Sequence, residues 1–179
     1  MLMARNIEIK ASVPDLARIR AKAASLAAGP GQTIEQSDVF FVVPRGRLKV
    51  REFADGSGEL LAYDRADEAG PKESDYVRVA CPDARALVEA LSRALPARGT
   101  VAKRRELFLA GRTRIHLDQV EDLGAFVELE VVLAEDERIE NGVREAHELL
   151  RALGIPESAL IAGAYIDLLE GQRPAKGLS

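Results

Sequence analysis

The sequence predicts an α+β protein in which eight antiparallel strands close into a β-barrel and helices pack on its outside. Three observations support this fold. Apolar residues recur at every second position in eight segments, short turn signals such as Asp55-Gly56-Ser57-Gly58 separate consecutive segments, and three other segments have helical spacing. Short turns imply antiparallel neighbours. Helices that cover the apolar face of the sheet leave its charged face to line the inside of a barrel.

Capping residues help to place the helices. Asp15 and Asp83 carry side chains that are preferred at a helix N-cap, and Gly154 has the backbone freedom preferred just after a helix C-terminus. The three helical patterns span 16–26, 87–95 and 143–153. The strand candidates lie near 4–13, 33–43, 47–54, 58–65, 75–80, 98–110, 112–120 and 125–134.

The chain reads as a single domain over residues 1–179. Its 179 residues are enough to bury one substantial core, and the only linker-like stretch, from Ala66 to Lys72, is too short to separate two domains. We expect an ordered core from about residue 4 to 170. Residues 171–179 are expected to form a tail.

Charge and composition exclude several classes of protein. A net charge of −4 argues against nucleic acid as the main partner, because binding to phosphate backbones depends on surplus Lys and Arg. No stretch approaches the roughly 20 apolar residues of a membrane-spanning helix. The N-terminus lacks a secretory-signal pattern, and a single cysteine cannot form an internal disulfide. We therefore expect a cytoplasmic protein with no nucleic-acid or membrane partner. A homodimer is left open.

The residues that alternate with the apolar ones carry the functional information, because strand side chains two positions apart share a face. For any one strand alone, a solvated charged face is the simpler interpretation. Here, however, the charges are sorted by strand, which local ion pairing would not require. The second face comprises Asn6, Glu8 and Lys10; Arg47, Lys49 and Arg51; Tyr63 and Arg65; Lys103 and Arg105; Arg114, His116 and Asp118; and Glu128 and Glu130.

The acidic residues of this face suit a hard divalent cation. Glu128 and Glu130 lie about 6.6 Å apart along one strand face. Together with Glu8 and Asp118 they could form an all-oxygen site for Mg²⁺ or Mn²⁺. Enclosing acids and bases in one barrel is costly unless something lies between them, and a metal-bound triphosphate satisfies both sets. A lone histidine beside acids, such as His116, is more often a hydrogen-bonded structural residue than a catalytic base.

Several motifs, in order along nearly the whole chain, resemble those of the CYTH family of triphosphate tunnel metalloenzymes. Residues 6–10 (NIEIK) resemble its E-x-E-x-K signature, with Asn6 in place of the first glutamate. Residues 46–52 (GRLKVRE) resemble its basic strand, and 71–76, 101–105, 116–118 and 123–130 match as well. The resemblance implies a barrel that holds a triphosphate, and it is closest to the class IV adenylate cyclases.

The resemblance also implies roles for individual residues. Glu8, Lys10 and Glu130 are expected to be catalytic. The metal-binding positions are Glu8, Asp118, Glu128 and Glu130. The substrate-binding positions are Lys10, Lys49, Arg51, Arg65, Lys72, Lys103, Arg105 and Arg114.

Three functions remain open from the sequence. In the first, ATP is converted to cyclic AMP and pyrophosphate. In the second, a metal-oriented water hydrolyses thiamine triphosphate, tripolyphosphate or a nucleotide. The scarcity of aromatic residues, at 4% with no tryptophan, leaves no obvious platform for a base and so keeps hydrolysis open. In the third, the protein binds polyphosphate or nucleotide without catalysis.

Overall fold

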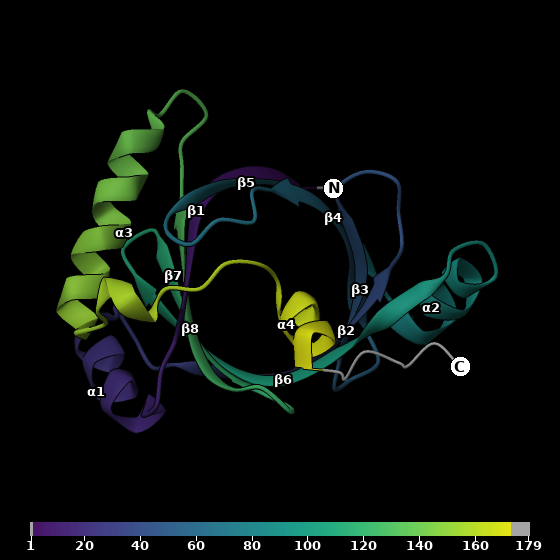
Figure 1. Ribbon diagram of the computed structural model, residues 1–179, viewed down its shortest axis with the longest axis horizontal. Helices are drawn as coiled ribbons and strands as arrows, with labels where there is room; N and C mark the ends of the chain where they lie inside the picture. The colour runs from purple at the N-terminus through teal and green to yellow at the C-terminus, as the bar shows by residue number, and fades with distance from the viewer. Residues whose placement is uncertain (1, 173–179) are drawn as a thin grey trace.

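The computed structural model describes residues 2–172, with side chains described for residues 5–64 and 66–172. Eight antiparallel strands close into a barrel in the order β1-β5-β4-β3-β2-β6-β7-β8 (Figure 1). Their bounds are β1 (Leu2–Ser12), β2 (Gln32–Phe41), β3 (Arg47–Phe53), β4 (Gly58–Arg65), β5 (Lys72–Cys81), β6 (Ala97–Ala110), β7 (Thr113–Val120) and β8 (Gly124–Val132). The predicted fold class is confirmed.

Helices lie outside this wall. They are α1 (Leu16–Leu26), α2 (Ala84–Ser92), α3 (Ile139–Leu153) and α4 (Tyr165–Gln172), with a 3₁₀ turn at Glu157–Ala159. The Asp15 and Asp83 side chains accept hydrogen bonds from the first-turn amides of α1 and α2, as their sequence positions predict. Gly154 ends α3 with a φ of 72°, a conformation that glycine adopts at little cost.

The main apolar core lies between the outer face of the barrel and its helices. Ile7 and Ile9 of β1 pack with Leu150 and Leu153 of α3, and all four are almost completely buried. A β-carbon at Gly142 would lie 2.7 Å from atoms of Ile7, so glycine allows α3 to approach the wall closely. A smaller cluster lies under α2. Because the apolar side of each strand is used in this way, the charged side faces inward.

The structure changes a few predicted boundaries. Strand β5 begins at Lys72, at the end of the linker-like stretch, and a fourth helix reaches Gln172. Gly171 and Gln172 therefore belong to α4, while the rest of the predicted tail, 173–179, lies outside the described residues. Every helix within residues 2–172 is too short or too polar to cross a membrane.

Candidate active site

The inward faces of all eight strands surround a cavity of about 260 Å³. Of the residues predicted from the sequence to form the site, nine line it: Glu8, Lys10, Lys49, Arg51, Lys103, Arg105, Arg114, Glu128 and Glu130. Asp118 and Lys72 are buried but are not among the lining residues. The Lys72 amine donates to the Glu68 carbonyl oxygen at 2.7 Å. Arg65 lies on β4, and its side chain is not among those described.

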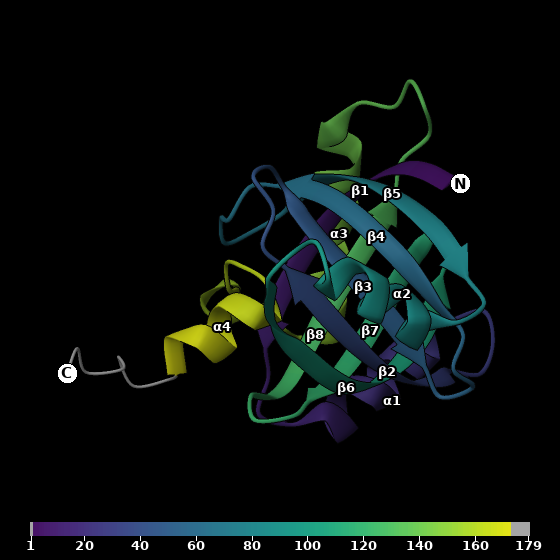
Figure 2. The same ribbon diagram turned by 90° about the vertical axis from the view of Figure 1, so that its right-hand side faces the viewer.

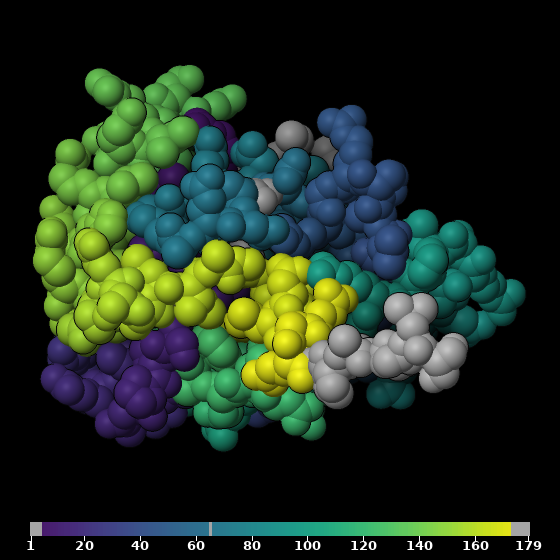
Figure 3. Space-filling model, in the orientation of Figure 1, coloured from purple at the N-terminus to yellow at the C-terminus, as the bar shows by residue number. Residues whose placement is uncertain are grey.

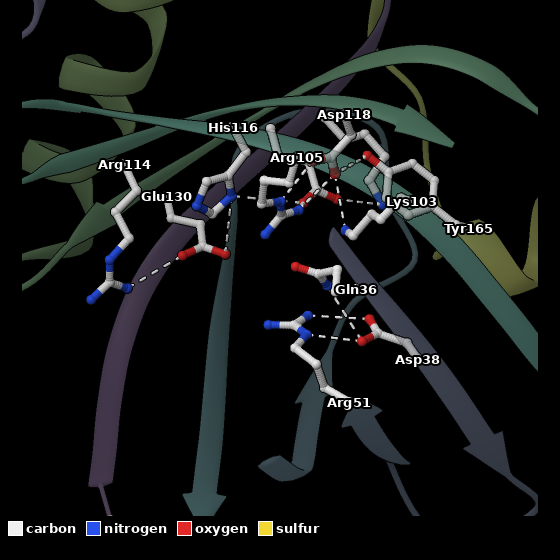
Figure 4. A network of polar contacts seen from close by, with 12 residues as sticks. Gln36, Asp38, Arg51, Lys103, Arg105, Arg114, His116, Asp118, Glu130 and Tyr165 are labelled. Atoms are coloured by element: carbon white, nitrogen blue, oxygen red, sulfur yellow. Dashed lines mark hydrogen bonds and ion pairs between the residues drawn. The ribbon is translucent and has the colours of Figure 1, made fainter. Parts of the chain in front are cut away.

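Asp118 projects to the same side of β7 as His116 and binds two basic side chains that line the cavity (Figure 4). Its carboxylate accepts from Arg105 Nε and Nη2, both at 2.6 Å, and from Lys103 Nζ at 2.9 Å. Burial alone would raise the pKa of Asp118, but Arg105 and Lys103 hold it well below its ordinary value. The carboxylate therefore stays ionised and fixes both bases. Its assignment as a metal ligand remains a prediction.

A second group of the same kind is centred on Asp38, which sequence reasoning missed. Asp38 accepts from Lys49 Nζ at 2.6 Å and from Arg51 Nε at 2.8 Å, and it is only 2% exposed. Burial would raise its pKa, but these two cations lower it below its ordinary range. Gln36 and Asp38 project inward, but the positions beside them, Glu35 and Ser37, are also polar, so β2 lacks the apolar–polar alternation that marks the other strands.

Glu128 connects the acidic and basic sides of the cavity. Its carboxylate lies 3.0 Å from Lys10 Nζ and accepts from Arg105 Nη2 at 2.5 Å. Burial opposes its ionisation, yet Lys10, Lys103 and Arg105 hold the pKa of Glu128 well below its ordinary value. On either side of β8 in the sheet register, Glu130 faces Glu8 of β1 and Arg114 of β7. The predicted catalytic residues Glu8, Lys10 and Glu130 are thereby brought together.

The donor atoms at this end of the cavity suit a divalent cation. Among the described side chains, two deeply buried polar atoms have no hydrogen-bond partner: Asn6 Oδ1 and His116 Nδ1. Both residues line the cavity together with Glu8, Glu128 and Glu130. Carboxylate and amide oxygens are the ligands that Mg²⁺ and Mn²⁺ prefer in proteins, and imidazole nitrogen is a ligand for transition-metal ions. Within the described part of the chain, His116 Nδ1 lacks the hydrogen bond expected of a structural histidine, and the role of His116 stays a prediction.

The C-terminal segment covers one end of the cavity. Helix α4 lies against that end of the barrel (Figures 1 and 2), held by ion pairs from Arg98 to Asp167 and Glu170. The buried Tyr165 ring lies 4.0 Å from Lys10 Nζ, and its hydroxyl donates to Asp118 at 3.0 Å. In the space-filling view the C-terminal segment crosses the middle of this face (Figure 3).

The charged side chains that line the middle of the cavity, from Lys10, Lys49 and Arg51 round to Lys103, Arg105 and Glu128, form a charged belt. Apolar side chains flank this belt at both ends. At the Tyr165 end lie Phe40 and Val101. Stepping by two along β2, β3 and β6 past the charged residues leads to Ile34, Phe53 and Leu107, which also line the cavity. No base-stacking surface was evident from the sequence, and these three half-buried residues form an apolar part of the cavity lining.

Comparisons with solved structures find the same fold in other proteins. The fold resembles that of a Pyrococcus horikoshii protein, with a TM-score of 0.81, 26% identity, and 91% of this chain and 98% of that chain covered. A candidate adenylate cyclase from Vibrio parahaemolyticus gives a TM-score of 0.74 at 18% identity, covering 93% and 98% of the two chains. A candidate adenylyl cyclase from Hippeastrum, described as having a dominant triphosphatase activity, gives 0.63 at 17%, covering 95% and 98%.

The sequence itself identifies the family. A search of curated proteins found no match. The CYTH domain family, in contrast, matches residues 4–165, which is most of the chain. This match agrees with the closed barrel and with the acids and bases gathered inside it. The chain therefore belongs to the CYTH family of triphosphate tunnel proteins.

Proposed function

We propose that this protein is a metal-dependent enzyme that acts on a triphosphate bound inside the barrel, and that its reaction is the conversion of ATP to cyclic AMP and pyrophosphate. One observation carries the proposal. Bases from β1, β3, β6 and β7 and carboxylates from β1 and β8 line the same enclosed cavity. Such a site can neutralise both the negative charge of a polyphosphate and the positive charge of its metal ion.

The side chains divide into two sets. Lys49, Arg51, Lys103 and Arg105 are held in place by Asp38 and Asp118, so they can donate to phosphate oxygens without reorganising. Glu8, Glu128 and Glu130 would hold Mg²⁺ or Mn²⁺, which neutralises phosphate charge and lowers the pKa of a bound hydroxyl. In cyclisation the 3′ hydroxyl gives its proton to solvent and its oxygen bonds to the α-phosphorus, while the bond from that phosphorus to the β-bridging oxygen breaks and pyrophosphate leaves.

The apolar trio Ile34, Phe53 and Leu107 favours an organic triphosphate over an inorganic one. The trio continues the strands that carry the bases, so a nucleoside could lie there while its phosphates reach the charged belt. A second function, hydrolysis of the terminal phosphate, is supported by the triphosphatase activity described for the structurally similar Hippeastrum protein. Both reactions use the same residues, and they differ in which phosphorus faces the nucleophile.

Product analysis separates these functions. Purified protein is incubated with Mg²⁺ or Mn²⁺ and, in turn, with ATP, thiamine triphosphate and tripolyphosphate. We expect cyclic AMP and pyrophosphate from ATP. Release of orthophosphate instead would establish the hydrolase, and binding of all three compounds without turnover would leave a non-catalytic binding protein.

A single variant checks that any product comes from this site. Glu130→Gln keeps the shape of the side chain but removes its charge, so we expect turnover to be lost while the circular dichroism spectrum is unchanged. Glu35→Gln, on the outer face of β2 with a 59% exposed side chain, is the control and should retain wild-type activity. Full activity in Glu130→Gln would refute the catalytic assignment of Glu130.

A further inference from the structure

His116 is a buried residue of the cavity to which the proposed mechanism gives no role. Its side chain is 5% exposed, and it projects from β7 beside Glu128 of β8 in the sheet register. Its Nδ1 has no hydrogen-bond partner among the described residues, although the ring is surrounded by polar groups. Such an atom costs free energy in the folded state unless a ligand satisfies it.

The distances around Nδ1 suit a shared ion better than a hydrogen bond. Nδ1 lies 3.7 Å from Glu130 Oε1 and 3.9 Å from Glu128 Oε2, beyond the roughly 3.2 Å limit of a good hydrogen bond. Two ligand atoms that are each about 2.1 Å from one cation lie about 3.0–4.2 Å apart, depending on the angle between them. All three residues offer ligand atoms within 4.8 Å of one another.

The two carboxylates beside His116 are not equally available to a metal ion. Of the two glutamates, Glu128 is already bound by Lys10 and Arg105, whereas Glu130 has a longer contact, 3.3 Å, to Arg114. Glu130 is thus the more available carboxylate.

We propose that His116 is a direct metal ligand through Nδ1, together with Glu130 and assisted by Glu128, and that this nitrogen makes the site prefer Mn²⁺ to Mg²⁺. Imidazole binds transition-metal ions well, whereas Mg²⁺ prefers an all-oxygen environment. The inference rests on the proposed metal-dependent function of the same cavity. It adds a nitrogen ligand and a metal preference to a site that was expected from the sequence to be made only of oxygens.

The two histidines of the chain allow a direct spectroscopic test. Full-length protein with ¹⁵N-labelled histidine is loaded with Mn²⁺, with and without pyrophosphate, and electron spin-echo envelope modulation is recorded. His147→Gln removes the only other histidine, which lies on α3 with a 33% exposed side chain. We expect ¹⁵N modulation from a directly bound nitrogen in this variant. Bound Mn²⁺ without such modulation would overturn the inference, even if His116 variants failed to fold.

Calorimetry tests the metal preference without relying on turnover. His116→Gln should weaken Mn²⁺ binding by about tenfold or more and change Mg²⁺ binding by less than about threefold, because only Mn²⁺ gains from the nitrogen. Equal losses for both ions would contradict the proposed preference. Turnover without nitrogen modulation would support the proposed function but show that His116 is not a metal ligand. Modulation without turnover would show that His116 binds the metal but would contradict the proposed enzymatic function.

Discussion

Asp38 and Asp118 have equivalent positions in two neighbouring strand pairs. Asp38 faces Arg51 across β2 and β3, and Asp118 faces Arg105 across β6 and β7. Each aspartate also binds the lysine two residues before its arginine. The repeated arrangement means that basic residues, which would otherwise repel one another in the cavity, are each paired with one of two buried carboxylates. We interpret both aspartates as positioning residues for the side chains that we propose to bind phosphate.

Removing one of these carboxylates should destabilise the protein in the absence of ligand. Asp38→Asn leaves the largely buried cations Lys49 and Arg51 without their nearest counter-charge, and breaking a buried pair in this way typically costs about 3–5 kcal/mol. Urea unfolding measures the loss. Tripolyphosphate should recover more stability in the variant than in the wild type, because its oxygens replace the missing carboxylate. The exposed Glu35→Gln on the same strand should change stability by less than about 1 kcal/mol.

Lys49 should make ligand binding depend on pH. Burial lowers the pKa of Lys49 to about 8, an effect that the nearby cations Arg51 and Lys103 increase and that Asp38 opposes. The rings of Phe40 and Tyr63 lie 5.3 and 5.7 Å from its amine. Above pH 8 the amine in the free protein becomes neutral and loses a charge-assisted hydrogen bond to phosphate, so affinity should fall by roughly 1.5–3 kcal/mol.

Tripolyphosphate binding, measured by calorimetry from pH 6.5 to 9.5, tests this dependence. Lys49→Arg is the matched variant, because its guanidinium stays protonated over the whole range. The phosphates of the ligand also titrate, but they do so equally with both proteins. A fall in affinity near pH 8 that persists unchanged in Lys49→Arg would assign the effect to another group.

At the scale of whole elements, the strands were predictable because each one carries its own information. In β1, Ile7 and Ile9 face the helices while Glu8 and Lys10 face the cavity, so one segment predicts both the fold and the site. In β2 the same reasoning failed, because Ile34 and Phe40 share the inward face with Asp38 and hide its polar character. The distances that make His116 a candidate ligand depend on register between strands, which no single segment specifies.

Helix α4 was the element least open to prediction from sequence. Its place across the barrel depends on contacts with residues far away in the chain, including the ion pairs of Arg98 and the hydrogen bond from Tyr165 to Asp118. The three helical patterns expected from the sequence did not include this segment. Tertiary packing then decided that the Tyr165 ring lies beside Lys10 in the cavity.

Tyr165 should both stabilise the barrel and limit the length of the bound polyphosphate. Tyr165→Phe removes one hydrogen bond to an ionised group and should cost about 1.5 kcal/mol. Tyr165→Ala also removes a buried ring and should cost about 3–5 kcal/mol. Urea unfolding separates the two values.

By opening the covered end, Tyr165→Ala should also raise the affinity for pentapolyphosphate relative to tripolyphosphate, and an unchanged ratio would show that Tyr165 does not set this limit.

At the scale of the whole molecule, the cavity differs in charge from the protein that contains it. Among the described side chains, seven basic and five acidic ones line the cavity, a surplus of two positive charges, whereas the chain as a whole has a net charge of −4. This surplus attracts an anion, but it is too small to balance a fully ionised triphosphate. A divalent cation supplies the remainder, so ion and anion should bind more tightly together than apart.

This coupling should appear as a stabilisation of the folded protein. The cavity exists only in the closed barrel, so ligands bind the native state and raise its melting temperature. At 100 times its dissociation constant, a ligand adds about 2.7 kcal/mol, which for a protein of this size is roughly 5–11 °C. Scanning fluorimetry with Mn²⁺, tripolyphosphate and both together should give a combined shift larger than the sum of the separate shifts. In Glu130→Gln, tripolyphosphate alone should still raise the melting temperature, because the bases are intact. The combined shift should no longer exceed the sum of the separate shifts, because a proposed metal ligand is removed. Additive shifts in the wild type would mean that metal and anion do not share the cavity.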